Sequence, residues 1–175
     1  DHPMALYQWI IMQTRSYFRR LEFSTSIDPA RSPRDFDPDW TSRRKRIFLY
    51  HQKLEEIFLT QPSVLSSNRI FCVRGIVAML SGDHDKAIQQ IEHSLDFFPP
   101  LEESYENMIR LLRLKGKYPK AFQLSLQGHQ ADRGSLAIKD QLTSLRIFLA
   151  PQKGDQIVQE FLTGIRELSE IIEDD

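Results

Sequence analysis

Residues 82–99 read GDHDKAIQQIEHSLDFFP, and residues 116–133 read GKYPKAFQLSLQGHQADR. The two stretches begin alike: Gly82 and Gly116 lie 34 residues apart, and the alanine five positions after each glycine keeps the same spacing. This spacing indicates a repeated structural unit. Repeats of this length are typical of stacked helical hairpins, which present a binding surface rather than a catalytic centre.

The composition favours helices around this repeat. Of the residues, 41% are hydrophobic and 27% are charged, and the chain has only seven glycines for tight turns. We expect an all-α chain of about eight helices. They are predicted over residues 5–23, from Thr41 or Ser42 to just before Pro62, and over 66–81, 83–97, 101–115, 117–130, 135–149 and 154–172. The short connections force neighbouring helices to pack antiparallel, as stacked hairpins.

Three segments are expected in the chain. Residues 1–60 hold the N-terminal helices and a loop at 24–39, where three prolines disfavour helix. Residues 61–150 hold the repeats, and residues 151–175 hold a C-terminal helix that caps the stack. The apolar stripe of this last helix is alternatively left open to bind another helix or a second copy.

Small residues and breakers set the geometry of each repeat. Gly82 and Gly116 are placed to end a helix in the left-handed conformation that other residues resist. Gly75 and Ala87 are small enough to let two helices of one hairpin approach closely. Pro99 cannot continue a helix and therefore separates one unit from the next.

At these positions the sequence resembles the tetratricopeptide repeat family, whose unit is a 34-residue helix–turn–helix. The units are residues 68–101, residues 102–135 and a degenerate third at 136–150. Matching positions in the first unit are Phe71, Gly75, Ala78, Gly82, Ala87, Ile91, Ser94 and Pro99, and in the second Tyr105, Met108, Leu112, Gly116, Tyr118, Ala121, Ser125 and Gly128. Arg74 and Ile109 depart from the pattern, so both units are degenerate members.

The resemblance implies a short solenoid in which the first helix of each hairpin lines a concave surface. The groove-facing positions it implies are Arg69, Cys72, Ile76, Met79, Glu103, Glu106, Arg110, Arg113, Asp140, Ser144 and Ile147. We expect a partner to contact Arg69, Ile76, Met79, Glu106, Arg110, Arg113, Ser144 and Ile147. Arg110 and Arg113, one turn apart, are suited to an acidic segment or, alternatively, form a solvated helix face. The family's carboxylate clamp is not expected, because Cys72 and Ile76 replace its lysine and asparagine.

Cysteine content and hydropathy bear on the compartment. Cys72 is the one cysteine and has no internal disulfide partner, so we expect a buried, reduced side chain and a cytoplasmic protein. The run ALYQWIIM near the start is far shorter than the roughly 20 residues of a membrane span. Membrane insertion is therefore not expected.

The sequence carries no recognisable catalytic or cofactor motif. It has no glycine-rich phosphate loop, nucleophile elbow or paired-cysteine metal motif, so neither an enzyme nor a cofactor is expected. His51 and Glu55 lie four residues apart and are interpreted as a surface pair, because a third metal ligand is not evident. The stretch SRRKR at 42–46 is compatible with a nucleic-acid patch, but such a run on the first turns of a helix is more often a solvated face, and direct nucleic-acid contact is not expected.

Three functions fit this pattern. The first is a scaffold or adaptor that binds a peptide or helix of another protein through the concave surface. The second is a regulatory domain, because residues 101–127 resemble the helical activation domain found behind winged-helix domains in some bacterial transcription regulators. The third is a secretion chaperone with three such repeats. Self-association is compatible with the basic residues 1–75 and the acidic residues 150–175.

Overall fold

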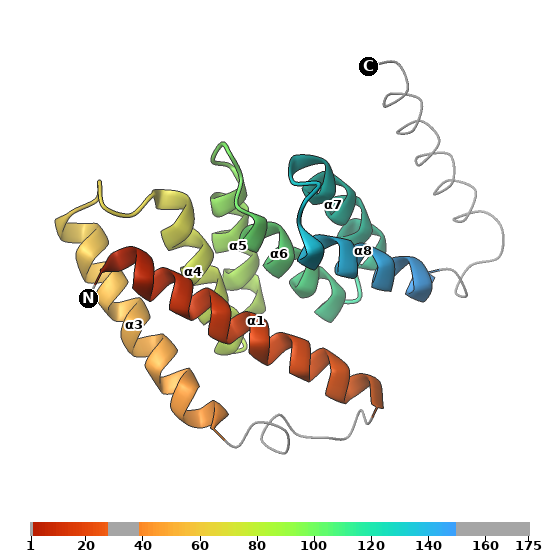
Figure 1. Ribbon diagram of the computed structural model, residues 1–175, viewed down its shortest axis with the longest axis horizontal. Helices are drawn as coiled ribbons and strands as arrows, with labels where there is room; N and C mark the ends of the chain where they lie inside the picture. Colours follow the sequence, from red (N-terminus) through yellow and green to blue (C-terminus); the bar gives the residue numbers. More distant parts are fainter. Residues whose placement is uncertain (1, 28–38, 150–175) are drawn as a thin grey trace.

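A computed structural model describes residues 2–27 and 39–149, and these residues form seven helices and no strand. The helices, labelled as in Figure 1, are α1 (Pro3–Ile27), α3 (Trp40–Thr60), α4 (Ser67–Leu80), α5 (His84–Leu95), α6 (Glu102–Leu114), α7 (Tyr118–Ala131) and α8 (Leu136–Leu149). The all-α prediction is confirmed for this part of the chain. None of the described helices combines the length and hydropathy that crossing a membrane would require. The helix predicted over 154–172, and its capping role, lie outside the described residues.

The helices from α3 to α8 follow one another across the molecule, each packed against the next in the chain (Figure 1). α4 also contacts α6, and α6 also contacts α8, so these alternate helices share one face. α1 lies across that face: it packs against α3 and α4, and its side chains reach α6. The first helix of the chain is therefore part of the packed body, not an appendage to the helices that follow it.

Both predicted glycine turns are confirmed. Gly82 has φ +82° and Gly116 has φ +68°, the left-handed region that glycine adopts without a Cβ clash. In each turn the residue after the glycine donates its N–H to a carbonyl of the preceding helix. Asp83 donates to Ala78 at 3.0 Å, and Lys117 donates to Leu112 at 2.8 Å. The 34-residue spacing in the sequence thus marks two turns of the same geometry.

The close helix crossing predicted at Gly75 is also confirmed. A Cβ added to Gly75 would lie 2.3 Å from Cγ1 of Ile91 and 3.2 Å from the backbone oxygen of Ala87. Gly128 makes a second close approach, where an added Cβ would lie 3.0 Å from both Tyr105 and Ile138. Small residues therefore set the spacing between α4 and α5 and between α7 and its two neighbours.

The boundaries of the N-terminal helices differ from the prediction. α1 continues to Ile27, four residues into the segment 24–39 that was expected to be a loop. α3 begins at Trp40, and the residue before it, Asp39, makes no side-chain capping hydrogen bond. The expected caps at Thr41 or Ser42 are therefore wrong. Burial decides this start, because the Trp40 ring stacks on Tyr17 of α1 with 3.5 Å between centroids.

α1 contributes directly to the hydrophobic core. Tyr7 and Ile10 are 1% and 0% exposed and belong to the same cluster of buried residues as Cys72 and Ile76 of α4. Cys72 is fully buried, as predicted, and burial raises the pKa of its thiol to about 12. The apolar face of α1 therefore covers the face that α4 and α6 share, and this contact decides which groups remain open to a partner.

Candidate functional site

A buried ion-pair network forms where α1 crosses α6. Nε of Arg15 lies 2.6 Å from Oε2 of Glu106, a residue only 2% exposed. The other carboxylate oxygen of Glu106 lies 3.3 Å from the guanidinium of Arg110, which is itself buried and sits over the Phe18 ring at 4.5 Å. One carboxylate thus pairs with two arginines from different helices, which fixes α1 over α6.

The network extends to α8 through Glu102. Its Oε1 lies 3.3 Å from Nη2 of Arg15 and accepts a hydrogen bond of 2.6 Å from the hydroxyl of Ser135, at the start of α8. Burial disfavours the charged form of Arg15, but the attraction of Glu106 outweighs it and holds the pKa of the guanidinium above its ordinary value. Arg15 therefore stays charged and links α1 to α6 directly, and through Glu102 to Ser135 at the start of α8.

Beside this network lies a small polar hollow between α1, α6 and α8, which we call the α6–α8 hollow. Its volume is about 190 Å³, and its lining residues are Arg19, Glu106, Arg110, Ala137, Asp140, Gln141 and Ser144. Gln141 is held in place because its side-chain oxygen accepts a hydrogen bond from Arg113. Two positive and two negative side chains meet here, so the hollow suits polar rather than purely apolar groups.

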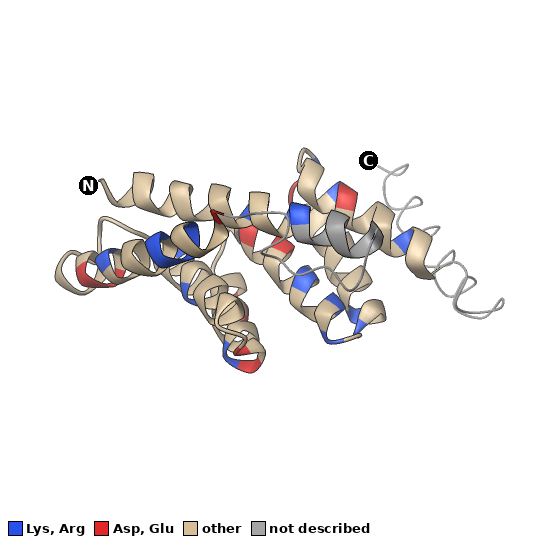
Figure 2. Ribbon diagram, turned by 90° about the horizontal axis from the view of Figure 1, so that it is seen from below, with Lys and Arg blue, Asp and Glu red and all other residues tan. Residues whose placement is uncertain are grey.

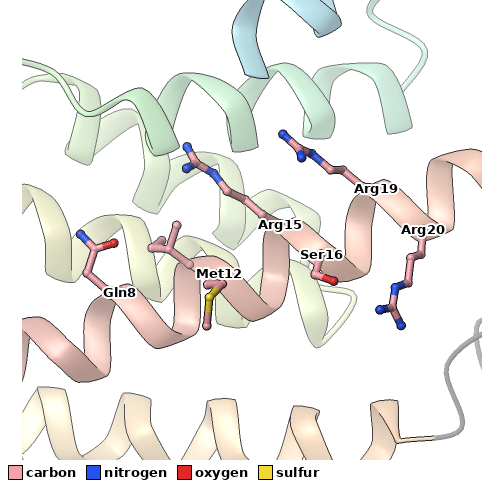
Figure 3. A pocket seen from close by; sticks show the side chains of 7 residues that line it. Gln8, Met12, Arg15, Ser16, Arg19 and Arg20 are labelled. Carbon is pink, nitrogen blue, oxygen red and sulfur yellow. The ribbon is translucent and has the colours of Figure 1, made fainter. Parts of the chain in front are cut away.

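A larger open hollow runs along the outer side of α1, and we call it the α1 hollow. Its volume is about 560 Å³, and it is lined by Gln8, Ile11, Met12, Arg15, Ser16, Arg19 and Arg20. Figure 3 shows Arg15 and Arg19 reaching toward the helices behind α1, while Arg20 points to the opposite side and Met12 and Ser16 lie between. Met12 is 58% exposed, so the hollow has an apolar side chain among its polar ones.

Arg19 joins the two hollows, because it lines both. Its side chain is exposed, and no hydrogen bond or ion pair within the described part of the chain uses its guanidinium. Further positive charge lies on the neighbouring helix, where lysine and arginine gather over the first turns of α3 (Figure 2). The accessible face of α1 and the start of α3 therefore form a predominantly basic surface.

Four of the residues expected to contact a partner are buried. Ile76, Met79, Glu106 and Arg110 are 0%, 5%, 2% and 4% exposed. The physical reason is α1, whose apolar side covers α4 and α6 and whose Arg15 pairs with Glu106. The expectation of an open concave surface at these positions is corrected accordingly.

The other four expected positions remain at least partly accessible. Arg69 is half-buried beside the Tyr7 ring and donates to Ser66, and Arg113 is half-buried against Gln141. Ser144 and Ile147 are exposed on one face of α8, and Ile147 is 69% exposed. The fold brings Glu106, Arg110 and Ser144 to the α6–α8 hollow, with Ile147 one turn beyond, whereas Arg69 lies apart from it.

His51 and Glu55 form the expected pair, with 3.0 Å between Nε2 and Oε1. Arg74 also binds Glu55 through two contacts of 2.6 Å, and these hydrogen bonds hold the pKa of Glu55 below its ordinary value despite partial burial. Burial lowers the pKa of His51. No group of three histidine, cysteine or acidic residues lies close enough to hold a metal ion in the part of the chain that the structure describes.

The α1 hollow was missed from the sequence. Residues Arg15, Arg19 and Arg20 fit a solvated face of a predicted amphipathic helix, and nothing local marks them as part of a site. The one available signal is the outward stripe formed by Gln8, Met12 and Ser16 at four-residue spacing, which keeps an apolar side chain among polar ones.

No protein-family model matches the chain, and neither a curated protein nor a solved structure matches it. Its function must therefore be inferred from the residues and contacts of the chain itself.

Proposed function

We propose that the protein is an interaction module, a scaffold or adaptor without catalytic activity, whose hairpins form a short tetratricopeptide-like solenoid. Support for this arrangement comes from two equivalent turns, at Gly82 and Gly116, and from the close crossing at Gly75. The contacts of α4 with α6 and of α6 with α8 are those expected when repeats stack. The module binds a peptide segment or a helix of another protein.

The observation that carries this proposal is the pair of adjoining hollows along α1. They share Arg19 and together follow α1 onto α8, where Ser144 lines the smaller hollow. Protein interfaces combine apolar anchors with polar groups at their rim. On this surface Met12 and Ile147 are exposed apolar side chains, and arginines and other polar side chains lie near them. The binding surface is thus displaced from the first helices of the repeats to α1 and α8.

Ile147 provides the sharper test of this surface. Reversing the charge of Arg110 would instead place a second carboxylate beside buried Glu106 and perturb the fold. Ile147→Glu alters an exposed side chain, and Leu59→Glu is a matched control, because Leu59 is 77% exposed on α3. Tagged wild-type and variant chains are used to capture proteins from cells of the source organism, which are compared by quantitative mass spectrometry.

The expected result is a protein that wild type and Leu59→Glu both retain and that Ile147→Glu loses. Purified, this protein should bind wild type directly and bind Ile147→Glu at least about tenfold more weakly. Equal capture by both variants would place the binding surface elsewhere. Capture of nothing above a bead control would remove the support for an interaction module.

A further inference from the structure

The α1 hollow has the form of a seam along one helix. Gln8, Met12 and Ser16 recur every four residues, and the arginines at 15, 19 and 20 border this line. From Gln8 to Arg20 the seam extends about 18 Å, the length of three helical turns. This is the extent over which a second helix contacts a first one laid beside it.

The charges around the seam are unevenly distributed. On the side of α6, Glu102 and Glu106 are engaged by Arg15, and on the side of α8 Asp140 is the acidic group that lines the adjoining hollow. On the side of α3, the guanidinium of Arg46 lies 5.8 Å from the centroid of the Trp9 ring of α1, and Arg43, Arg44 and Lys45 precede it in the same helix. Among the described residues at the start of α3, Asp39 is acidic and lies 3.9 Å from Arg43.

We infer that the α1 hollow binds an acidic amphipathic helix of a partner protein. A carboxylate of this helix would pair with Arg19, and an apolar side chain of the same helix would lie on Met12. Arginine suits this role because its planar guanidinium binds a carboxylate through two hydrogen bonds. The inference rests on the proposed function and names the partner class for the same surface.

Two features favour a helix over a phosphate-bearing partner. Exposed Met12 lies in the middle of the line Gln8, Met12 and Ser16, whereas a nucleic-acid backbone or a lipid headgroup gains nothing from an apolar side chain there. The residues of the seam also recur at helical spacing, which matches the way amphipathic helices dock through successive turns.

The test uses the full chain and a synthetic peptide as probe. The peptide is an amphipathic helix of about 18 residues, with a leucine stripe flanked by glutamates, and a second peptide has glutamine in place of every glutamate. Binding is followed by fluorescence anisotropy for wild type, Arg19→Glu, Met12→Glu and Lys120→Glu. Lys120 is exposed on α7 and lines neither hollow, so it controls for the change in net charge.

The glutamate peptide should bind wild type at least about tenfold more tightly than the glutamine peptide does. Arg19→Glu and Met12→Glu should each weaken binding at least about fivefold, with circular dichroism unchanged, while Lys120→Glu has no such effect. Equal binding of the two peptides, or equal loss in Lys120→Glu, would overturn the inference.

Three other occupants are outcomes of the same assay. Tighter Arg19-dependent binding of a uridine oligonucleotide or of phosphatidylserine vesicles would replace the acidic helix with a phosphate ligand. Preferred binding of a peptide with the sequence of residues 154–172 would assign the surface to the chain's own segment, and Arg19-dependent dimerisation in sedimentation would assign it to a second copy. If Ile147→Glu loses a partner while Arg19→Glu leaves peptide binding unchanged, the proposed function stands and this inference fails.

Discussion

Arg15 and Glu106 lie 91 positions apart in the sequence and only 2.6 Å apart in the structure, between Nε and Oε2. The contact joins α1 to α6. Because Glu106 is 2% exposed, this ion pair is shielded from water, and removing one partner leaves a buried charge without compensation. The position of α1, and with it the candidate binding surface, depends on this network.

Glu106→Gln is expected to destabilise the fold by about 3 kcal/mol, because Arg15 and Arg110 then lose their shared carboxylate without a change in side-chain shape. The measurement is urea denaturation followed by circular dichroism. Glu56→Gln is the control: Glu56 is exposed on α3, and its replacement should cost no more than about 0.5 kcal/mol. Equal stabilities of the two variants would show that the network does not hold α1.

Ala87→Glu and Ala121→Glu are each expected to unfold the chain or to destabilise it by more than about 3 kcal/mol. Both alanines are 0% exposed, so each substitution forces a carboxylate into a close helix crossing. Gln89→Glu and Gln123→Glu place the same residue two positions further on, at exposed sites, and should change stability by less than about 0.5 kcal/mol. Unchanged melting temperatures in both alanine variants would contradict the repeat register.

Gly82→Ala should cost about 1 kcal/mol through backbone strain alone, because φ is +82° and an added Cβ would meet no atom within 4 Å. Gly82→Asn should cost less, since asparagine tolerates the left-handed region better. Gly75→Ala should cost more than Gly82→Ala, because its Cβ would clash with Ile91. Chemical denaturation of the three variants gives this order, and a smaller loss in Gly75→Ala would refute the close crossing.

The hydrogen bonds from Arg74 hold the pKa of Glu55 below its ordinary value, so the folded state binds this proton less readily than the unfolded state. Its contribution to stability is therefore fully present above the unfolded pKa of about 4.3 and is lost as the pH falls through the lower folded value. Arg74→Met should raise the pKa of Glu55 in an NMR titration and reduce the stability difference between about pH 7 and pH 3. Arg44→Met, at an exposed position of α3, should leave the titration unchanged.

Cys72 should resist thiol reagents while the chain is folded. Burial raises the pKa of its thiol to about 12, so almost no thiolate forms near neutral pH, and the side chain is 0% exposed. Labelling by a chromogenic disulfide should occur only after denaturant unfolds the chain. Met12→Cys adds a control thiol at a 58% exposed position, which should react at once, and equal rates for the two thiols would contradict the burial of Cys72.

Local chemistry in the sequence accounts for much of the repeat region. Gly82 and Gly116 end their helices because only glycine adopts positive φ without strain, and Gly75 sits at a crossing that admits no Cβ. Each of these turns and crossings involves residues that are a few positions apart or belong to one hairpin, so residue identity and spacing are sufficient to predict it. The same holds for Cys72, an apolar side chain within an apolar stretch.

The start of α3 and the identity of the open surface depend on contacts between distant segments. Trp40 begins its helix because it stacks on Tyr17, although Thr41 and Ser42 are better caps by residue type. Arg19 and Met12 line an open surface because the opposite side of α1 is buried against α3, α4 and α6. Neither outcome could be predicted from residues near in sequence.

The sequence by itself determined an all-α chain with two equivalent glycine turns and a close helix crossing at Gly75. Only the tertiary structure decided that α1 covers the face shared by α4 and α6, burying Ile76 and Arg110 and leaving Arg19 and Ile147 accessible. The physical reason is that an amphipathic pattern indicates that a helix buries one face, but it does not indicate which other helix covers that face. That choice is made by packing and by ion pairs such as Arg15 with Glu106, whose partners no local spacing connects.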